Sequence, residues 1–325
     1  MALITHEPHA GHSSNLIATF RLSQQAPVLL KQQLSKERNV LLSLVNKSEE
    51  PENHGMTEQL FFACLQSGDD KSAVLCLELL TRRFGSSNER VTALRGLYEE
   101  ALAENQFELE QCLHKYDALL SDNALNLPIS RRRIALLRAM SRPADAIASL
   151  VELLKAIPTD AEAWCELADL YHSQGMNLQA IFSLEEALLI TPNAWNIHAR
   201  LGEVLYICAC PLDTEDSIQL LRRSIQYFCR SVELCDDYLR GYYGLAMATF
   251  LICSRNPSTG SSNELLSVST EDMLYNNRVE KLNKLAKTKL EDIVERRSVD
   301  LQLWEYSQGE LIAAKELLDR MTGLH

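Results

Sequence analysis

The residues of this chain that could do chemistry are few, and their spacing does not assemble a catalytic or metal-binding site. Cys208 and Cys210 form the closest cysteine pair, but no second pair or adjacent histidine completes a zinc site around them. His172 could act as a general base, yet no nucleophile lies near it in the sequence. We therefore interpret the cysteines as small residues at a helix end, and His172 as a partly exposed residue at another.

Other signatures of chemistry point the same way. The sequence lacks the glycine-rich phosphate and dinucleotide loops, the GxSxG elbow of hydrolases and the HExxH motif of zinc proteases. His6, His9 and His12 lie among proline, glycine and serine, so residues 1–14 are predicted to be a disordered terminus. We expect a protein that is not an enzyme and that holds no cofactor or metal.

Composition favours a soluble, cytoplasmic protein that does not bind nucleic acid. The 325 residues carry a net charge of −12, whereas binding to nucleic acid needs a basic surface that displaces counterions from phosphates. No apolar run approaches the roughly 20 residues of a membrane-spanning helix, and the N-terminus lacks the features of a secretory signal. Nine scattered cysteines are typical of buried thiols in a reducing compartment. The one basic cluster, Arg131-Arg132-Arg133, is interpreted as a solvated helix face.

A repeat organises the helices that would position any functional side chain. Residues 161–194 predict a helix-turn-helix unit in which Gly175 permits the turn and Pro192 ends the second helix. Its packing positions are Trp164, Leu167, Ala168 and Tyr171 on the first helix and Ala180, Leu184 and Ala187 on the second. The same pattern recurs 34 residues earlier, and again later after an enlarged loop over residues 208–216. One unit cannot bury its own apolar faces, so the repeats must stack.

The repeat predicts an all-α tetratricopeptide-repeat (TPR) α-solenoid of about five to six helix pairs with a C-terminal capping helix. After the disordered residues 1–14, we expect an N-terminal helical segment at 15–56 and the solenoid at 57–252. A flexible loop at 253–270, which contains the loop-like stretch SRNPSTGSSN at 254–263, then leads to the final helices at 271–325.

The first helix of each pair lines the concave side of such a solenoid, so its residues between packing positions are candidates for partner binding. The candidates on three successive first helices are Glu162, Asp169, His172, Asn196, Glu203, Tyr206, Arg240, Tyr243, Met247 and Phe250. This order predicts a groove that changes from acidic to apolar and aromatic. An acidic chaperone tail is a disfavoured ligand, because Asp169 and Glu203 would repel it.

Two longer segments resemble a known family. The run through Glu166, Phe182 and the Leu184-Glu185-Glu186 stretch, and the later Tyr242-Tyr243-Gly244-Leu245, are similar to subunit 2 of the endoplasmic reticulum (ER) membrane protein complex, a TPR protein. The likeness covers about Thr57 to Ile252, and the enlarged loops depart from the family pattern.

The resemblance implies a non-catalytic scaffold held peripherally at the cytoplasmic side of the ER membrane. It implies a hetero-oligomer in which this subunit binds cytosolic segments of membrane-embedded subunits and supports insertion of tail-anchored and multi-pass proteins. Membrane contact would then be indirect. Two alternatives remain open at this point: an adaptor for the C-terminal tail of a chaperone or another cytosolic partner, and an enzyme with an unrecognised site near His172.

Overall fold

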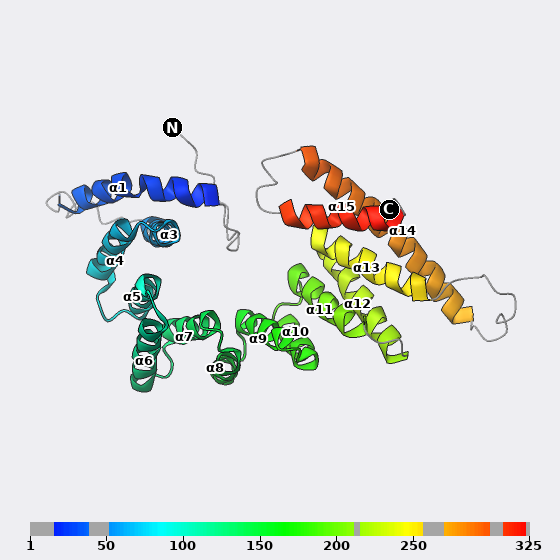
Figure 1. Cartoon of the computed structure of the whole chain (residues 1–325), viewed down its shortest axis with the longest axis horizontal. Helices are drawn as coiled ribbons and strands as arrows, with labels where there is room; N and C mark the ends of the chain where they lie inside the picture. Colours follow the sequence, from blue (N-terminus) through cyan, green and yellow to red (C-terminus); the bar gives the residue numbers. More distant parts are fainter. Residues whose placement is uncertain (1–15, 39–51, 211–214, 256–269, 300–307, 323–325) are drawn as a thin grey trace. The chain divides into compact units, whose positions relative to one another are not determined.

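The computed structural model describes residues 16–38, 52–210, 215–255, 270–299 and 308–322, and these residues form fourteen helices with no strand among them (Figure 1). Several predictions lie outside these ranges: the disordered terminus at 1–14, most of the loop at 253–270, and the middle of the enlarged loop at 208–216. The described edges of the two loops are helical, since one helix ends at Ala209 and another at Arg255. None of the described helices is both long and apolar enough to cross a bilayer.

The chain divides into two compact units, residues 1–149 and 150–325. The helices of the first unit are α1 (Leu16–Arg38), α3 (Glu52–Ser67), α4 (Asp70–Phe84), α5 (Glu89–Leu102), α6 (Gln106–Asp122), α7 (Leu127–Ala139) and the start of α8 (Pro143–Ala156). The helices of the second are the rest of α8, α9 (Ala161–Ser173), α10 (Asn177–Ile190), α11 (Trp195–Ala209), α12 (Glu215–Leu234), α13 (Leu239–Arg255), α14 (Thr270–Val299) and α15 (Gln308–Thr322).

Short polar residues start many of these helices. The side chains of Asp69, Asn88, Asn105, Asn126 and Asp160 each accept a hydrogen bond from a backbone N–H in the first turn of α4, α5, α6, α7 and α9. Such a cap satisfies donors that have no partner within the helix. These caps fix the residue at which each of the five helices begins.

The turn between α9 and α10 confirms one sequence prediction. Gly175 has a φ of 72°, in the left-handed region that suits glycine. The backbone N–H of Met176 donates back to the carbonyl of Tyr171, which closes the end of α9 before α10 begins. The two helices of this unit then pack through Ala168, Ala180 and Leu184, all at most 1% exposed.

Unit 1 is held together by an apolar cluster and by a glycine beneath a tyrosine. Phe61 and Cys76 are fully buried in a cluster that α1, α3, α4 and α5 share. On α5, Gly96 lies directly against the Tyr116 ring of α6, where any Cβ atom would overlap the ring. Gly96 thus lets α5 and α6 approach closely, as small residues do in helix packing.

In unit 2 a phenylalanine ring packs against glycine in the same way. Phe228 of α12 is 1% exposed, and its ring lies between Gly202 of α11 and Gly244 of α13. A Cβ atom at Gly202 would meet the ring at 3.1 Å, and one at Gly244 would overlap it. At the C-terminal end, α15 buries Leu311 and Leu317 in the cluster that also contains Leu290 of α14, so α15 caps this unit. The all-α TPR architecture is confirmed.

Candidate partner-binding groove

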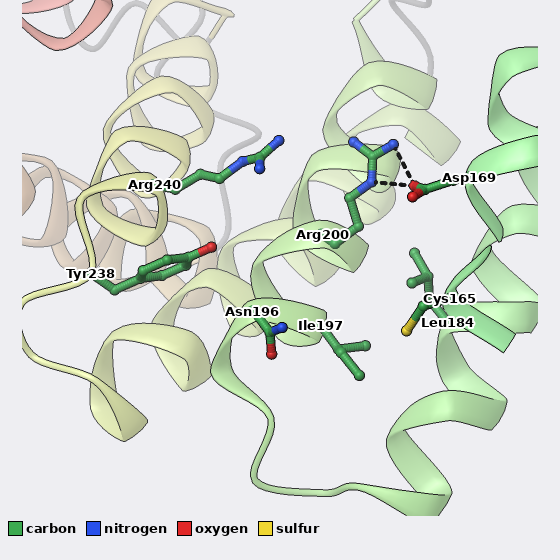
Figure 2. Close-up of a pocket in the computed structure, with 8 residues that line it drawn as sticks. All are labelled: Cys165, Asp169, Leu184, Asn196, Ile197, Arg200, Tyr238 and Arg240. Atoms are coloured by element: carbon green, nitrogen blue, oxygen red, sulfur yellow. Dashed lines mark hydrogen bonds and ion pairs between the residues drawn. The ribbon is translucent and has the colours of Figure 1, made fainter. Parts of the chain in front are cut away.

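A cavity of about 390 Å³ opens in unit 2 beside the first helices of three successive pairs, α9, α11 and α13. Because equivalent helices stack in a repeat protein, residues about one repeat apart meet along this face. We call this cavity the pocket (Figure 2); it is lined by Cys165, Asp169, Leu184, Asn196, Ile197, Arg200, Tyr238 and Arg240.

One wall of the pocket continues into an alternating row of charges, here called the ion-pair ladder: Asp169, Arg200, Glu203 and Arg240. Arg200 donates from Nη2 and Nε to Asp169 Oδ1, at 2.9 and 3.1 Å (Figure 2). It also donates from Nη1 to Glu203 Oε2 at 3.0 Å. Arg240 then donates to the other side of Glu203, from Nε to Oε1 at 2.5 Å. The ladder therefore links α9, α11 and α13 by charge-assisted hydrogen bonds.

The ladder corrects the predicted charge of the groove. Asp169 and Glu203 were expected to make this region acidic, but each faces a guanidinium group, and the two carboxylates and two guanidiniums sum to zero. Periodicity places a residue on a face without showing what its side chain meets. The repulsion argument against an acidic ligand consequently loses its basis.

The rest of the pocket is uncharged. Ile197 and Leu184 are nearly buried and supply apolar surface. Burial raises the pKa of the Cys165 thiol to about 11, helped by the nearby charges of Asp169 and Glu162. Burial likewise raises the pKa of Tyr238. Both groups are therefore protonated and neutral at pH 7, and the thiol is a poor nucleophile or metal ligand.

The structure brings four of the ten candidate residues together. Asp169, Asn196 and Arg240 line the pocket, and Glu203 joins them through the ladder. Glu162 is exposed in the first turn of α9 but does not line the pocket. His172 is hydrogen-bonded through Nδ1 to Asn177 Oδ1 at 3.0 Å, across the turn between α9 and α10.

The remaining four candidates lie farther along α11 and α13. Tyr206, Tyr243 and Met247 are half-buried and pack against the apolar cluster of α11–α15. Burial and a hydrogen bond with Cys210 raise the pKa of Tyr206, so its hydroxyl is neutral as well. Phe250 is 44% exposed. These residues extend the candidate surface, but the pocket does not include them.

A second polar cluster lies in unit 1, on α5, α6 and α7. The Glu100 side chain is only 8% exposed and accepts hydrogen bonds from Arg132 Nε at 2.9 Å and from the Tyr116 hydroxyl. Arg133 pairs with Asp117 at 2.6 Å. The prediction of a solvated face for the arginine cluster is therefore wrong for Arg132 and Arg133, whose side chains are 26% and 25% exposed.

These pairs share a spacing that the sequence search missed. A carboxylate on one first helix pairs with an arginine on the next, about one repeat later. The pairs are Glu58–Arg90 and Glu100–Arg132, each 32 residues apart, Asp169–Arg200, 31 apart, and Glu203–Arg240, 37 apart. A search for an acidic residue followed by arginine one repeat later would have found Arg200, which the candidates omit. No such pattern points to Tyr238.

These carboxylate–arginine pairs join neighbouring helices and do not form a metal site. Within the ranges that the structure describes, no three His, Cys, Asp or Glu side chains gather closely enough to hold a metal ion. In the pocket the Cys165 thiol is protonated at neutral pH, and both arginines are paired with carboxylates. The pocket therefore offers polar groups around an apolar floor, which is the usual lining of a binding site.

Comparison with known proteins supplies a family. Residues 75–219 match a family model described as the EMC2 TPR-like repeat domain. The TPR repeat protein oca3 of Schizosaccharomyces pombe is 33% identical over 189 residues, which cover 58% of this chain and 64% of that protein. The ER membrane protein complex subunit 2-B of Xenopus laevis is 34% identical over 204 residues, covering 63% and 64%. The chain thus spans slightly less than two thirds of each relative.

A solved structure supports the fold alone. The C-terminal part of a TPR repeat-containing protein from Cytophaga hutchinsonii aligns with a TM-score of 0.50 and 12% identity, covering 83% of this chain and 95% of that one. The family rests on the sequence matches, which bear out the resemblance found in the residues. Residues 75–219 therefore match the EMC2 TPR-like repeat domain, and the chain is similar to proteins named as subunit 2 of the ER membrane protein complex.

Proposed function

We propose that this protein is a non-catalytic scaffold subunit of an ER membrane protein complex, peripherally associated with the cytoplasmic side of the membrane. The observation that carries the proposal is the match of residues 75–219 to the EMC2 TPR-like repeat domain. In this role it binds cytosolic segments of membrane-embedded subunits and so supports the insertion of tail-anchored and multi-pass proteins. It acts as one member of a hetero-oligomer, and its own contact with the membrane is indirect.

The pocket and the ladder are the part of the surface that we assign to partner binding. They lie on the stacked first helices, where Asp169, Asn196, Glu203 and Arg240 meet. Glu162, His172, Tyr206, Tyr243, Met247 and Phe250 are assigned to the flanks of the same surface. A groove of this kind presents side chains from several repeats to one extended segment, which suits a scaffold.

The test is recovery of integral membrane subunits with the tagged protein from detergent-solubilised membranes. We expect the parent protein and Arg230→Glu, an exposed charge reversal on α12 outside the pocket, to recover them equally. Arg200→Glu places three carboxylates side by side in the ladder and should reduce recovery at least tenfold. If the parent protein recovered no membrane subunit, the proposed scaffold function would be refuted. If Arg200→Glu recovered as much as the parent protein, the assignment of partner binding to the pocket and the ladder would be refuted.

A chaperone-tail adaptor is the second candidate, and one observation favours it. The ladder neutralises Asp169 and Glu203, so an acidic tail would not meet an uncompensated negative wall. An acidic peptide with a free C-terminal carboxylate would then bind with micromolar affinity, and Asp169→Lys would strengthen its binding. Absence of measurable binding in a fluorescence titration would remove this candidate.

A further inference from the structure

The charged groups of the pocket are already committed to one another. Arg200 uses three of its guanidinium nitrogens on Asp169 and Glu203, and Arg240 uses two on Glu203. An incoming carboxylate or ammonium would have to displace one of these partners. Because the Glu203 side chain is only 19% exposed, that exchange would leave a partly desolvated charge without its counterion.

Two uncharged polar groups of the pocket remain open. Among the residues that the structure describes, neither the Asn196 carboxamide nor the Tyr238 hydroxyl makes a side-chain hydrogen bond. Figure 2 shows the Tyr238 hydroxyl, from the segment before α13, directed toward the space between the labelled residues, and the Asn196 carboxamide near the start of α11 beside Ile197. On the opposite side stand Cys165 and Leu184, so the open groups face an apolar and neutral wall.

The chemistry of these two groups selects a ligand. A carboxamide donates through nitrogen and accepts through oxygen, which matches the carbonyl and N–H of a peptide group. A tyrosine hydroxyl also donates and accepts. A buried peptide group needs such partners, whereas a charged side chain needs a counterion that the ladder does not offer. The cavity of about 390 Å³ is at the lower end of ligand pockets, enough for a short segment.

We propose that this pocket binds an uncharged stretch of extended polypeptide, whose main chain is held by Asn196 and Tyr238 while the ion-pair ladder forms a neutral wall. This inference rests on the partner-binding role proposed above and names the chemistry of the bound segment. The pocket discriminates mainly against charged peptides, because a charged peptide residue bound beside the ladder would have to displace one of its ion-pair partners. The ligand is therefore distinct from an acidic chaperone tail.

The probe is a phage-displayed library of random decapeptides, selected on the immobilised full-length chain at 150 mM salt. Enriched sequences are resynthesised with acetylated and amidated ends, and their dissociation constants are measured by fluorescence polarisation. We expect binders with an uncharged core of three or more residues, and little dependence of affinity on salt between 50 and 500 mM. An enrichment of acidic sequences, or no enrichment at all, overturns the proposal.

Variants locate the binding. Asn196→Ala and Tyr238→Phe should each weaken the selected peptides about tenfold, since each leaves a peptide group without its partner. Gln179→Ala removes an exposed carboxamide from α10 outside the pocket and serves as the matched control, with unchanged affinity. Thermal unfolding of each variant checks the fold. Affinities that both pocket variants leave unchanged would place the peptides elsewhere and overturn the inference.

The outcome is separable from that of the scaffold. Loss of membrane subunits in the pull-down would sink the proposed function but leave the measured peptide preference intact. Conversely, recovery of membrane subunits together with an acidic peptide preference would keep the scaffold and reject the neutral ligand.

Discussion

The two units place an aromatic ring over glycine in the same way, but the rings differ by one hydroxyl. In unit 1, Tyr116 covers Gly96 and its hydroxyl donates to the buried Glu100, which also holds Arg132. In unit 2, Phe228 lies between Gly202 and Gly244 and brings no polar atom with it. The Glu100–Arg132 pair of unit 1 is consequently part of the interior, whereas the Asp169–Arg200 pair of unit 2 lies closer to the surface.

This difference shows that ion pairs between first helices can stabilise the interior in one unit and line a pocket in the other. The spacing of α11 and α13 is set by an apolar ring between two glycines, so the ladder above it is not needed to hold the helices together. In the Asp169–Arg200 pair the side chains are 51% and 30% exposed, and pairs this exposed contribute little to stability. The Glu100 cluster, by contrast, is a buried charge whose partners cannot be removed without cost.

The largest effect is expected at Glu100. Replacing it with alanine leaves Arg132 partly buried without its counterion and the Tyr116 hydroxyl without an acceptor, which should destabilise the protein by about 3–5 kcal/mol. Urea unfolding followed by circular dichroism measures the change. Glu99→Ala is the control, because its side chain is 37% exposed and its pair with Lys115 should contribute at most about 1 kcal/mol. Equal losses in the two variants would contradict the distinction between the clusters.

A smaller but clear loss is expected from Gly244→Ala. The added methyl group overlaps the Phe228 ring, so the α11–α12–α13 packing must shift at a cost of about 1–3 kcal/mol. Gly309→Ala in α15 is the matched control, since a Cβ atom there meets nothing within 4 Å and helix propensity favours alanine. Thermal unfolding compares the two. A stabilised Gly244→Ala protein would show that the glycine–phenylalanine contact does not set the spacing.

The ladder itself should matter little for stability. Arg200→Ala, Asp169→Ala and their combination form a double-mutant cycle, and we expect a coupling of at most about 1 kcal/mol between these exposed groups. The same cycle on Arg132 and Glu100 should give a clearly larger value. If the coupling energy of Arg200 with Asp169 were larger than that of Arg132 with Glu100, the proposed difference between the exposed pair and the buried pair would be wrong.

The smallest effect concerns acid. Hydrogen bonds from the Tyr242 hydroxyl and Lys289 lower the pKa of the exposed Asp236 below its ordinary value of 3.8. Since the folded pKa is the lower one, Asp236 contributes stability that is present above about pH 4 and is lost as pH falls through the folded value. Asp236→Asn should therefore lower the melting temperature slightly at pH 7, and the difference should shrink below pH 4. Tyr242→Phe should narrow the pH range over which this contribution of Asp236 is lost. A melting-temperature difference between the parent protein and Asp236→Asn that did not change with pH would contradict the lowered pKa of Asp236.

Sequence reasoning predicted the repeat, the turn at Gly175 and the first helices that carry the candidate groove. These features depend on local spacing, which a sequence displays directly. It missed that Arg200 and Arg240 neutralise Asp169 and Glu203, because side chains from different repeats must be placed together before their pairing is visible. It also took Arg132 and Arg133 for solvated residues, since nothing local reveals that their carboxylate partners lie 32 and 16 residues earlier, on other helices. Tyr238, which precedes α13, lay outside any repeat position.

The spacing of the ladder has a consequence for how such proteins diverge. Asp169 and Arg200 are 31 residues apart and Glu203 and Arg240 are 37 apart, yet both pairs form on the same stacked face. The start of α13 lies 44 residues after the start of α11, whereas α11 starts 34 residues after α9, and the pairing persists because Arg240 lies one helical turn nearer the start of its helix than Arg200 does. The length of chain between first helices can therefore change while an acid on one first helix still meets an arginine on the next.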